Sequence, residues 1–345
     1  MNSKNIRVLM YALFDQNNIQ AQSRDALNWS IHLDPEVYTI TAFSKGFIDE
    51  RVNSLSHIKI IKVSNNKYLR HLRMMISLIN PRYDYIILSM PSINISIYLW
   101  LVGRVKSLSK RIIISLVNRL PYPESYANLM YSKKFNQFAI SRKIKDDFNK
   151  ITNREIPIVH LAYDTQIFTP STSMPREKKI LCVGSMQLRK NPFLFSAVAR
   201  KLPDYEFIWV GNGYYYSWIQ ARKHNNKLEN LTLIKELNQT KLAQLMRNCS
   251  IFVLPSVHEG FPNVIVEALA SGLPVVTLET FGPEAVVHGY NGFIAKDEYD
   301  IYDMVKELLE DDDMYAKMKK NTVNSIKKYS GKEGVKEFHN FITKL

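Results

Sequence analysis

The sequence predicts an α/β protein made of two doubly wound parallel sheets. Short apolar runs alternate with helix-period segments along the chain, and the second half repeats the scheme of the first. A stretch rich in Pro, Ser and Thr, residues 164–178, separates the halves and is typical of a linker. With 345 residues, the chain is too long for one ordinary α/β core and suits two domains.

Short apolar runs mark the expected strands in both halves. In the first half they are Ile6–Tyr11, Tyr38–Phe43, Ile58–Val63, Tyr85–Ser89, Arg111–Leu116 and Phe135–Ser141. In the second half they are Lys179–Val183, Glu206–Val210, Leu231–Ile234, Ser250–Leu254, Pro274–Thr277 and Gly292–Ile294. The predicted domains are residues 1–163 and 164–325, followed by a C-terminal helix over 326–345 that packs back on the first domain. Because such sheets bind ligands beyond the carboxyl ends of their strands, we expect the site in the cleft between the domains.

Composition narrows the class of protein. The chain is 46% hydrophobic and 23% charged, which is typical of a globular protein rather than a disordered one. Its two cysteines, Cys182 and Cys249, lie in strand-like runs without a disulfide or zinc pattern, so we expect buried thiols in a reducing cytoplasm. The hydropathy pattern predicts neither a signal peptide nor a transmembrane helix.

Positive charge is concentrated in the N-terminal half. The net charge is +14, and residues 1–158 hold 23 Lys and Arg against 11 Asp and Glu, a surplus of 12. That surplus favours an anionic partner: a phospholipid membrane, a lipid-phosphate substrate or nucleic acid. Lys67–Arg82 and Trp100–Arg111 have the composition of helices at a membrane interface, which packed helices with a solvated basic face share. The summed charge favours peripheral contact with an anionic membrane; the chain shows no aromatic-interleaved nucleic-acid motif.

Three turns in the second half suit a phosphate-bearing ligand. Gly184 ends a strand-like run and is followed by Arg189 and Lys190, so backbone and positive charge can approach a diphosphate together. Gly211–Gly213 forms the turn after the next strand, and Glu259–Asn263 opens a helix whose N-terminus attracts anions. A nucleoside diphosphate is the simplest ligand that satisfies all three turns.

A carboxylate interrupts the apolar helix after the third turn. Val264–Ala270 is apolar almost all round except for Glu267, and Pro262 is expected as the first helical residue. An unpaired charge is costly in such surroundings, so Glu267 is expected to have a dedicated partner. One turn into the helix, its oxygens are placed to accept hydrogen bonds from vicinal hydroxyls such as a ribose diol.

The spacing of Glu259 and Glu267 within PSVHEGFPNVIVEALASGLPVV resembles the signature of the retaining glycosyltransferases of family 4. These enzymes adopt the GT-B fold, in which two Rossmann-like domains face a central cleft. Further matches are the Asp164–Pro170 segment, Gly184, Lys190, the Val210–Gly213 turn, Pro283-Glu284 and His288–Gly292. The resemblance covers most of residues 158–297; in the N-terminal half it extends only to the general βα layout.

The resemblance implies roles for the matched residues. Glu259 would contact sugar hydroxyls and Lys190 would hold the diphosphate, and these two are the expected catalytic residues; Glu267 would bind the donor ribose. The implied donor-binding set is Gly184, Ser185, Arg189, Lys190, Gly211, Lys235, Leu237, Gly260, Phe261, Pro262, Asn263 and Glu267. No cofactor and no metal is required on this view, because Lys190 and the helix N–H groups stabilise the charge of the leaving diphosphate.

Two of the chain's departures from the family concern its candidate site residues. Ser185 stands where the family usually has an arginine, and the candidate replacements are Lys190 itself, its neighbour Arg189, or Arg24 of the first domain. Many relatives also place a histidine after the fifth-strand region. Here that region has none, which leaves Asn118 as the candidate acceptor residue together with Arg24. These departures concern mechanism and acceptor geometry rather than the fold.

The sequence therefore predicts a cytoplasmic glycosyltransferase that is peripheral on the inner face of the cell membrane. It would transfer a hexose, with retention, from a nucleotide-diphosphate sugar to a lipid-diphosphate-linked or glycan acceptor in bacterial surface polysaccharide biosynthesis, such as lipopolysaccharide O-antigen or capsule. Two alternatives stay open. One is a non-catalytic GT-B relative that acts as a nucleotide- or glycan-binding partner subunit; the other is a nucleotide-sugar epimerase.

Overall fold

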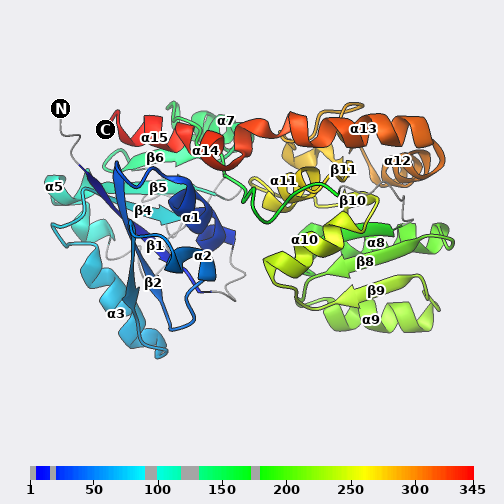
Figure 1. Ribbon diagram of the computed structural model, residues 1–345, viewed down its shortest axis with the longest axis horizontal. Coiled ribbons are helices and arrows are strands. Elements are labelled where there is room, and N and C mark those ends of the chain that lie inside the picture. The colour runs from blue at the N-terminus through cyan, green and yellow to red at the C-terminus, as the bar shows by residue number, and fades with distance from the viewer. Residues whose placement is uncertain (1–4, 16–20, 90–98, 118–131, 172–178) are drawn as a thin grey trace. The chain divides into compact units, whose positions relative to one another are not determined.

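The structure is a computed structural model that describes residues 5–15, 21–89, 99–117, 132–171 and 179–345. The chain divides into two compact units (Figure 1). The N-terminal unit is Met1–Ala162 with Gly331–Leu345, and the C-terminal unit is Tyr163–Ser330. Each unit holds one six-stranded parallel sheet. Across the described residues, no helix has both the length and the hydropathy needed to cross a bilayer.

The sheet of the N-terminal unit has the strand order β3-β2-β1-β4-β5-β6. Its strands are β1 (Ile6–Leu13), β2 (Tyr38–Ser44), β3 (Ile58–Lys62), β4 (Tyr85–Ser89), β5 (Ile112–Leu116) and β6 (Asn136–Ala139). After β3 the chain crosses back to β4 and then adds strands in the opposite direction. Right-handed crossovers therefore place the helices before and after this switch on opposite faces of the sheet. Val8, Leu9 and Met10 of the central strand β1 have no exposed surface, as expected for a parallel sheet covered on both faces.

The helices of this unit include two that come from the end of the chain. They are α1 (Ala21–His32), α2 (Glu50–Asn53), α3 (Lys67–Ser77), α5 (Lys106–Ser109), α7 (Arg142–Thr152), α14 (Gly331–Gly334) and α15 (Lys336–Ile342), with a further helical stretch at residues 99–102. Trp29 of α1 stacks on Phe338 of α15 and packs edge-on against Phe138 of β6, with ring centroids 5.5 and 5.7 Å apart. The backbone N–H of His160 donates to the Glu337 carboxylate at 2.8 Å. Aromatic packing and this hydrogen bond hold α15 to the unit.

The sheet of the C-terminal unit has the strand order β12-β11-β10-β7-β8-β9. Its strands are β7 (Lys179–Val183), β8 (Glu206–Val210), β9 (Leu231–Ile234), β10 (Ile251–Leu254), β11 (Val275–Leu278) and β12 (Gly292–Ala295). Its helices are η1 (Leu188–Lys190), α8 (Pro192–Lys201), α9 (Tyr216–Asn225), α10 (Gln239–Arg247), α11 (Asn263–Ala270), η2 (Glu279–Phe281), α12 (Glu298–Glu310), α13 (Asp312–Ser325) and η3 (Lys327–Tyr329). In Figure 1 the chain runs through this unit from green to orange.

The predicted α/β architecture is confirmed. Each expected strand forms close to its predicted bounds, and both sheets are parallel and doubly wound. One local prediction is wrong: Pro262 is not the first helical residue but caps α11 with ψ at 103°, so the helix begins one residue later at Asn263. The Pro262 carbonyl still accepts the first helical hydrogen bond, from the N–H of Ile265 at 3.0 Å. Residues 172–178 of the predicted linker lie outside the described residues.

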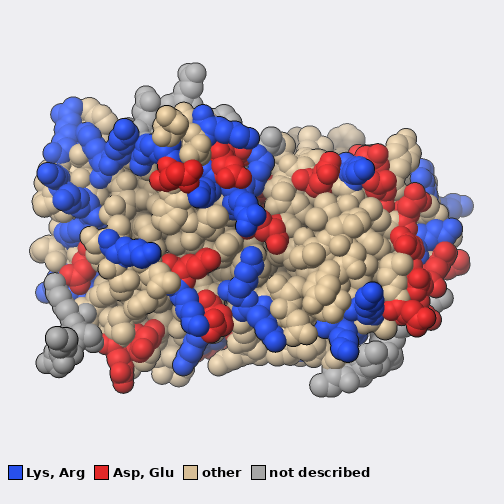
Figure 2. Space-filling model, turned by 90° about the horizontal axis from the view of Figure 1, so that it is seen from above, with Lys and Arg blue, Asp and Glu red and all other residues tan. Residues whose placement is uncertain are grey.

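Charge is distributed differently over the two units. On the face shown in Figure 2, Lys and Arg outnumber Asp and Glu over the N-terminal unit, at the left of the view. Asp and Glu gather on the C-terminal unit at the right of the view. In that unit, Glu307, Glu310 and the run Asp311–Asp313 lie together at the end of α12 and the start of α13.

We predict that Cys182 does not react with thiol reagents while the protein is folded. Cys182 has no exposed surface, and burial raises the pKa of its thiol well above the usual value, so the reactive thiolate is scarce. In a Cys249→Ala variant, titration with an aromatic disulfide at pH 8 should show no fast labelling until denaturant unfolds the C-terminal unit. Rapid stoichiometric labelling of the native variant would contradict the packing of β7.

Candidate functional site

The predicted donor residues lie at one edge of the sheet in the C-terminal unit. Strands β10, β7, β8 and β9 are consecutive neighbours, so the turns at their carboxyl ends are adjacent in space. Gly184 follows β7, Gly211 follows β8 and Lys235 follows β9. The segment that leads from β10 to α11 contains Glu259. Parallel pairing thus brings together turns that are separated by up to 75 residues in sequence, from Gly184 to Glu259.

A buried ion pair joins two of these turns. Lys190 Nζ lies 2.5 Å from Glu259 Oε1, and the side chains are 9% and 8% exposed. Lys190 ends η1, whose turn closes through the hydrogen bond from its N–H to the Gln187 carbonyl at 2.9 Å. The N–H of Val257 donates to the carbonyl of Arg189 at 2.8 Å, which joins the segment after β10 to the turn after β7. Backbone hydrogen bonds therefore fix the two segments that carry Lys190 and Glu259, in addition to the contact between the two side chains.

Arg189 supplies a second cation to the same carboxylate. Its Nη1 lies 3.3 Å from Glu259 Oε2 and donates at 3.3 Å to the carbonyl of His258. Its Nε donates to Gln187 Oε1 at 3.0 Å. Unlike Lys190, the Arg189 side chain is 44% exposed, so its guanidinium is accessible from solvent. Ser185 is half-buried in the turn after β7. Two cations against one carboxylate leave this cluster with a net positive charge, which suits an anionic ligand.

Glycine is required where the first two turns approach each other. Gly211 has φ of +146°, and a Cβ there would lie 2.7 Å from the carbonyl carbon of Gly184 and still closer to its oxygen. Gly213 has φ of +158°, and its Cβ would lie 2.7 Å from the Met186 carbonyl oxygen. The N–H of Met186 donates to the Asn212 carbonyl at 3.0 Å, so the two turns are also hydrogen-bonded. Close backbone approach is the physical reason for the Gly-x-Gly pattern that the sequence shows.

Asn191 is a positioning residue that the sequence analysis did not single out. Its φ of 50° ends η1, and its side-chain Oδ1 accepts from the N–H of Leu194 at 3.3 Å, which caps α8. One residue thus turns the chain directly after Lys190 and starts the next helix. The Asn-Pro dipeptide at positions 191 and 192 is the signal that could have identified it, since Pro is favoured at the first helical position.

Glu267 is buried in α11, as its apolar surroundings predicted. It is 2% exposed, and the residues on either side of it in the helix, Val266 and Ala268, are buried as well. Among its predicted neighbours, Pro262 and Asn263 are half-buried, whereas Phe261 is buried and packs edge-on against Tyr329 at a centroid distance of 5.2 Å. The ring of Phe261 therefore belongs to the core, and only its backbone is left to face a ligand.

The remaining predicted residues differ in burial and in the part of the chain to which they belong. Gly260 and Leu237 are half-buried, and the Lys235 ammonium lies 5.4 Å from the centroid of the Tyr216 ring. Arg24 is half-buried on α1 and belongs to the N-terminal unit. Asn118 lies outside the described residues. Within the described part of the chain, no group of three or more His, Cys, Asp or Glu side chains is arranged to hold a metal ion.

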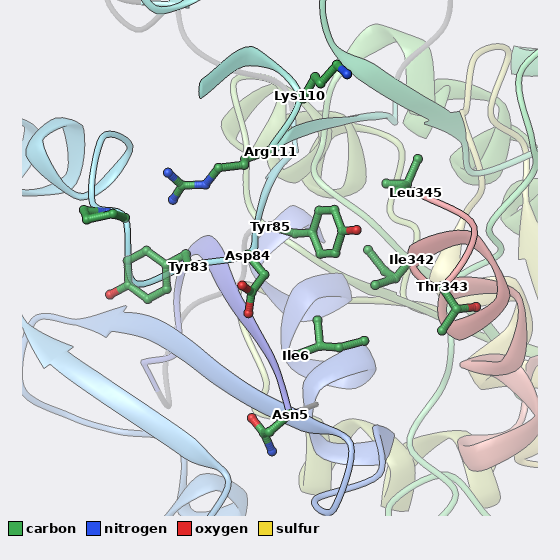
Figure 3. Close-up of a pocket in the computed structure, with 11 residues that line it drawn as sticks. Asn5, Ile6, Tyr83, Asp84, Tyr85, Lys110, Arg111, Ile342, Thr343 and Leu345 are labelled. Atoms are coloured by element: carbon green, nitrogen blue, oxygen red, sulfur yellow. The ribbon is translucent and has the colours of Figure 1, made fainter. Parts of the chain in front are cut away.

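A cavity of about 630 Å³ lies in the N-terminal unit, at the amino ends of β1, β4 and β5 (Figure 3). Figure 3 shows Tyr85 turned toward Ile342 and Leu345, while Arg111 extends to the opposite side. Burial lowers the pKa of Arg111. No motif in the sequence pointed to this cavity. It opens at the edge opposite to the one where doubly wound sheets bind their ligands, so we do not place the functional site there.

Comparison with known proteins identifies the domain that carries the predicted donor residues. The sequence profile of the family described as "Glycosyl transferases group 1" matches residues 164–325. The chain carries a domain of the glycosyl transferase group 1 family. The resemblance expected from the Glu259–Glu267 spacing is confirmed, and the group 1 domain coincides with most of the C-terminal unit, Tyr163–Ser330.

Individual relatives match this chain over limited stretches. An uncharacterised glycosyltransferase of Methanocaldococcus jannaschii is 32% identical over 130 residues, 37% of this chain and 37% of the relative. The N,N'-diacetylbacillosaminyl-diphospho-undecaprenol alpha-1,3-N-acetylgalactosaminyltransferase of Campylobacter jejuni is 35% identical over 94 residues, 26% of this chain and 25% of the relative. The chain thus matches well under half the length of these curated relatives.

A solved structure shares the whole fold. The chain is similar to HepE of Anabaena in its complex with UDP and glucose, with a TM-score of 0.78 and 16% identity. The superposition covers 99% of this chain and 100% of that one. The GT-B fold predicted from the sequence is therefore confirmed for the N-terminal unit as well, where sequence motifs were absent.

Proposed function

We propose that this protein transfers a hexose from a nucleotide-diphosphate sugar to a hydroxyl of a lipid-diphosphate-linked or glycan acceptor, with retention at the anomeric carbon. The observation that carries the proposal is the cluster of Lys190, Arg189 and Glu259 beside the glycine turns of the group 1 domain. In this proposal the two cations contact the diphosphate, and the carboxylate contacts the sugar that follows it.

Each proposed role follows from charge and burial. Lys190 and Arg189 would neutralise the diphosphate, so that Arg189 takes over the function of the arginine that Ser185 replaces. Glu267, buried one turn into α11, would accept hydrogen bonds from the ribose hydroxyls. The backbone of Gly260–Asn263 at the start of α11 would direct N–H groups at the phosphates. Two cations and a helix N-terminus supply the neutralisation that a metal ion would otherwise give, so we propose metal-independent transfer.

The reaction needs little covalent chemistry from the protein. The bond from the anomeric carbon to the diphosphate oxygen breaks, the acceptor oxygen bonds to that carbon on the same face, and the hydroxyl proton passes to the leaving diphosphate. Lys190 and Arg189 stabilise the negative charge that grows on the leaving group. Glu259 supplies the negative charge that stabilises the positive charge growing on the sugar ring, and the two cations hold its carboxylate in position.

A lipid-linked acceptor and a place at the inner face of the membrane are the finer parts of the proposal. The Campylobacter jejuni relative is named for transfer to an undecaprenol-linked diphosphate, and the surplus of positive charge in residues 1–158 suits an acceptor of that kind. Surface polysaccharide biosynthesis is the process in which we propose that this transfer occurs.

The donor site is tested by thermal unfolding with a panel of nucleoside diphosphates. A ligand at a hundred times its dissociation constant stabilises the folded state by about 2.7 kcal/mol. For a unit of this size that corresponds to a rise in Tm of roughly 5–10 °C. We expect one base to stand out, and we expect Lys190→Ala to lose the response. If none of the nucleotides shifts the Tm of the parent protein, the donor site is wrongly assigned.

The replacement of an arginine by Ser185 also favours a second candidate, a non-catalytic subunit that binds a nucleotide without turning over its sugar. Slow release of free sugar from the donor, lost in Glu259→Ala, would favour the enzyme. Tight donor binding without release of sugar, and without transfer to any acceptor extract, would favour the binding subunit.

A further inference from the structure

The outer face of α3 carries an apolar stripe that faces solvent. Leu69, Leu72 and Ile76 are spaced by three and four residues, so they share one face of the helix, and each is more than half exposed. The opposite face of α3 is already packed through Met74 and Ser77. A helix on the surface of a globular unit normally turns its apolar stripe inward, whereas the apolar stripe of α3 is directed outward.

A second exposed apolar group follows strand β4. Trp100 is 54% exposed and its neighbour Leu101 is 52% exposed. The Arg104 guanidinium lies 3.8 Å from the centroid of the Trp100 ring, a cation–π contact between residues one helical turn apart. An amphipathic aromatic ring beside an arginine is the pairing that membrane interfaces favour.

The two groups lie on the same face of the sheet. Helix α3 connects β3 to β4, and the stretch from residue 99 to α5 connects β4 to β5. Both crossovers run in the same direction along the sheet order, so right-handed connections place them on one face. The Arg111 guanidinium, directly after α5, donates to the Asn80 carbonyl in the loop after α3, which joins the ends of the two segments. We call the exposed residues of Lys67–Ile79 and of positions 100–106 the α3 face.

The sequence around the α3 face is almost free of negative charge. Residues 51–123 contain 12 Lys and Arg and one acidic residue, Asp84. That carboxylate is neutralised by Arg7, whose Nη2 lies 3.0 Å from Asp84 Oδ1. Lys67, Arg73 and Arg104 are exposed beside the apolar side chains. This stretch accounts for a surplus of 11 out of the chain's net charge of +14.

We propose that the α3 face binds the surface of an anionic phospholipid bilayer. Leu69, Leu72, Ile76 and Trp100 enter the boundary between headgroups and acyl chains, and the surrounding Lys and Arg side chains contact lipid phosphates. An apolar face that inserts between lipids and surrounding basic charge are the features of a helix that lies in the plane of the membrane interface. The inference deepens the proposed function, since it names the surface by which the protein reaches a lipid-linked acceptor.

Vesicle sedimentation without donor or acceptor tests the inference independently of sugar transfer. We expect binding to phosphatidylcholine vesicles that contain phosphatidylglycerol and little binding to phosphatidylcholine alone. Reversing Lys67 and Arg73 to Glu should weaken binding about a hundredfold or more, because two attractions become two repulsions. The matched control reverses Lys317 and Lys320, two exposed lysines of α13, and should leave binding unchanged.

A second variant separates the apolar contribution from the charge. Leu69→Ser, Leu72→Ser and Ile76→Ser together should weaken vesicle binding about tenfold or more, since each buried CH₂ contributes to insertion. These side chains are exposed, so Tm and the response to nucleoside diphosphates should stay as in the parent. A donor site that fails its own test would leave the vesicle result untouched, and the reverse also holds.

Tryptophan fluorescence reports which surface meets the lipid. Trp29 and Trp209 are buried, whereas Trp100 and Trp218 are exposed on different units, so each of the latter can be isolated by a Phe substitution of the other. Brominated phosphatidylglycerol should quench the Trp218→Phe variant, which reports Trp100, and should not quench Trp100→Phe beyond its value with plain vesicles. Equal quenching in both variants, binding that ignores phosphatidylglycerol, or charge reversals that abolish binding to nucleic acid but not to vesicles would each overturn the inference.

Discussion

Glu259→Ala is expected to lower kcat for sugar transfer by about 10²–10³-fold while nucleoside diphosphates bind as well as before or better. The carboxylate sits between Lys190 at 2.5 Å and Arg189 at 3.3 Å, so it competes with the diphosphate for the cations that the diphosphate needs. Removing it frees both cations for phosphate but takes away the negative charge that stabilises the developing positive sugar. Affinity for the leaving group and rate of transfer should therefore move in opposite directions.

The same substitution should destabilise the protein without ligand and make it unusually responsive to nucleotide. Breaking a buried ion pair by removing one partner costs about 3 kcal/mol, because Lys190 keeps its charge in a poorly solvated position. A nucleoside diphosphate would replace the lost negative charge, so its effect on Tm should be larger in Glu259→Ala than in the parent. Parallel calorimetry of the two proteins measures this difference.

Two further variants serve as controls for Glu259→Ala. Glu310→Ala removes an exposed carboxylate at the end of α12 and should change neither kcat nor nucleotide binding. Adding Lys190→Ala to Glu259→Ala should remove the enhanced response to nucleotide, since it removes the freed cation. A Glu259→Ala protein that transfers sugar at the parent rate would rule out the proposed role of this carboxylate.

Much of the C-terminal unit was predictable because its signals are local. The strand-like runs Lys179–Val183 and Glu206–Val210 became β7 and β8 with those bounds, since continuous apolar runs of strand length are typical of a buried parallel sheet. Glycine at 184 and 211 marked the turns, and a carboxylate at 267 in an apolar helix marked a special position. In each case neighbouring residues in the sequence carry the information.

The less predictable features depend on contacts between distant residues. Nothing near Arg189 in the sequence shows that its guanidinium reaches Glu259, 70 positions away, because that distance is set by the pairing of β7 with β10. Nor does the sequence of α3 show which of its apolar residues face the sheet, since Met74 and Leu72 differ in burial but not in hydrophobic character. Backbone geometry decides such cases, as it did when α11 began one residue after Pro262.

Gly211→Ala is expected to destabilise the C-terminal unit by roughly 3–5 kcal/mol and to abolish nucleotide binding. Two costs add at this position. Its φ of +146° is strained for any residue with a Cβ, and that Cβ would lie 2.7 Å from the Gly184 carbonyl carbon. The obstacle is backbone, so relief requires the turns after β7 and β8 to separate, which displaces the turn that holds Lys190. Chemical denaturation followed by circular dichroism measures the loss of stability.

Two other glycines separate the strain from the clash. Gly46 of the N-terminal unit has nearly the same φ as Gly211, +144°. Gly289 lies in the C-terminal unit, as Gly211 does, and has φ of +74°. A Cβ at either Gly46 or Gly289 would have no atom within 4 Å. Alanine at these positions should therefore cost only the backbone strain, about 1–2 kcal/mol, and should leave nucleotide binding intact. If Gly211→Ala proves no more costly than these two, the turns after β7 and β8 are not in close contact. The donor site would then lack the rigid pair of turns that holds its charged side chains in position, because Lys190 belongs to the same turn as Gly184.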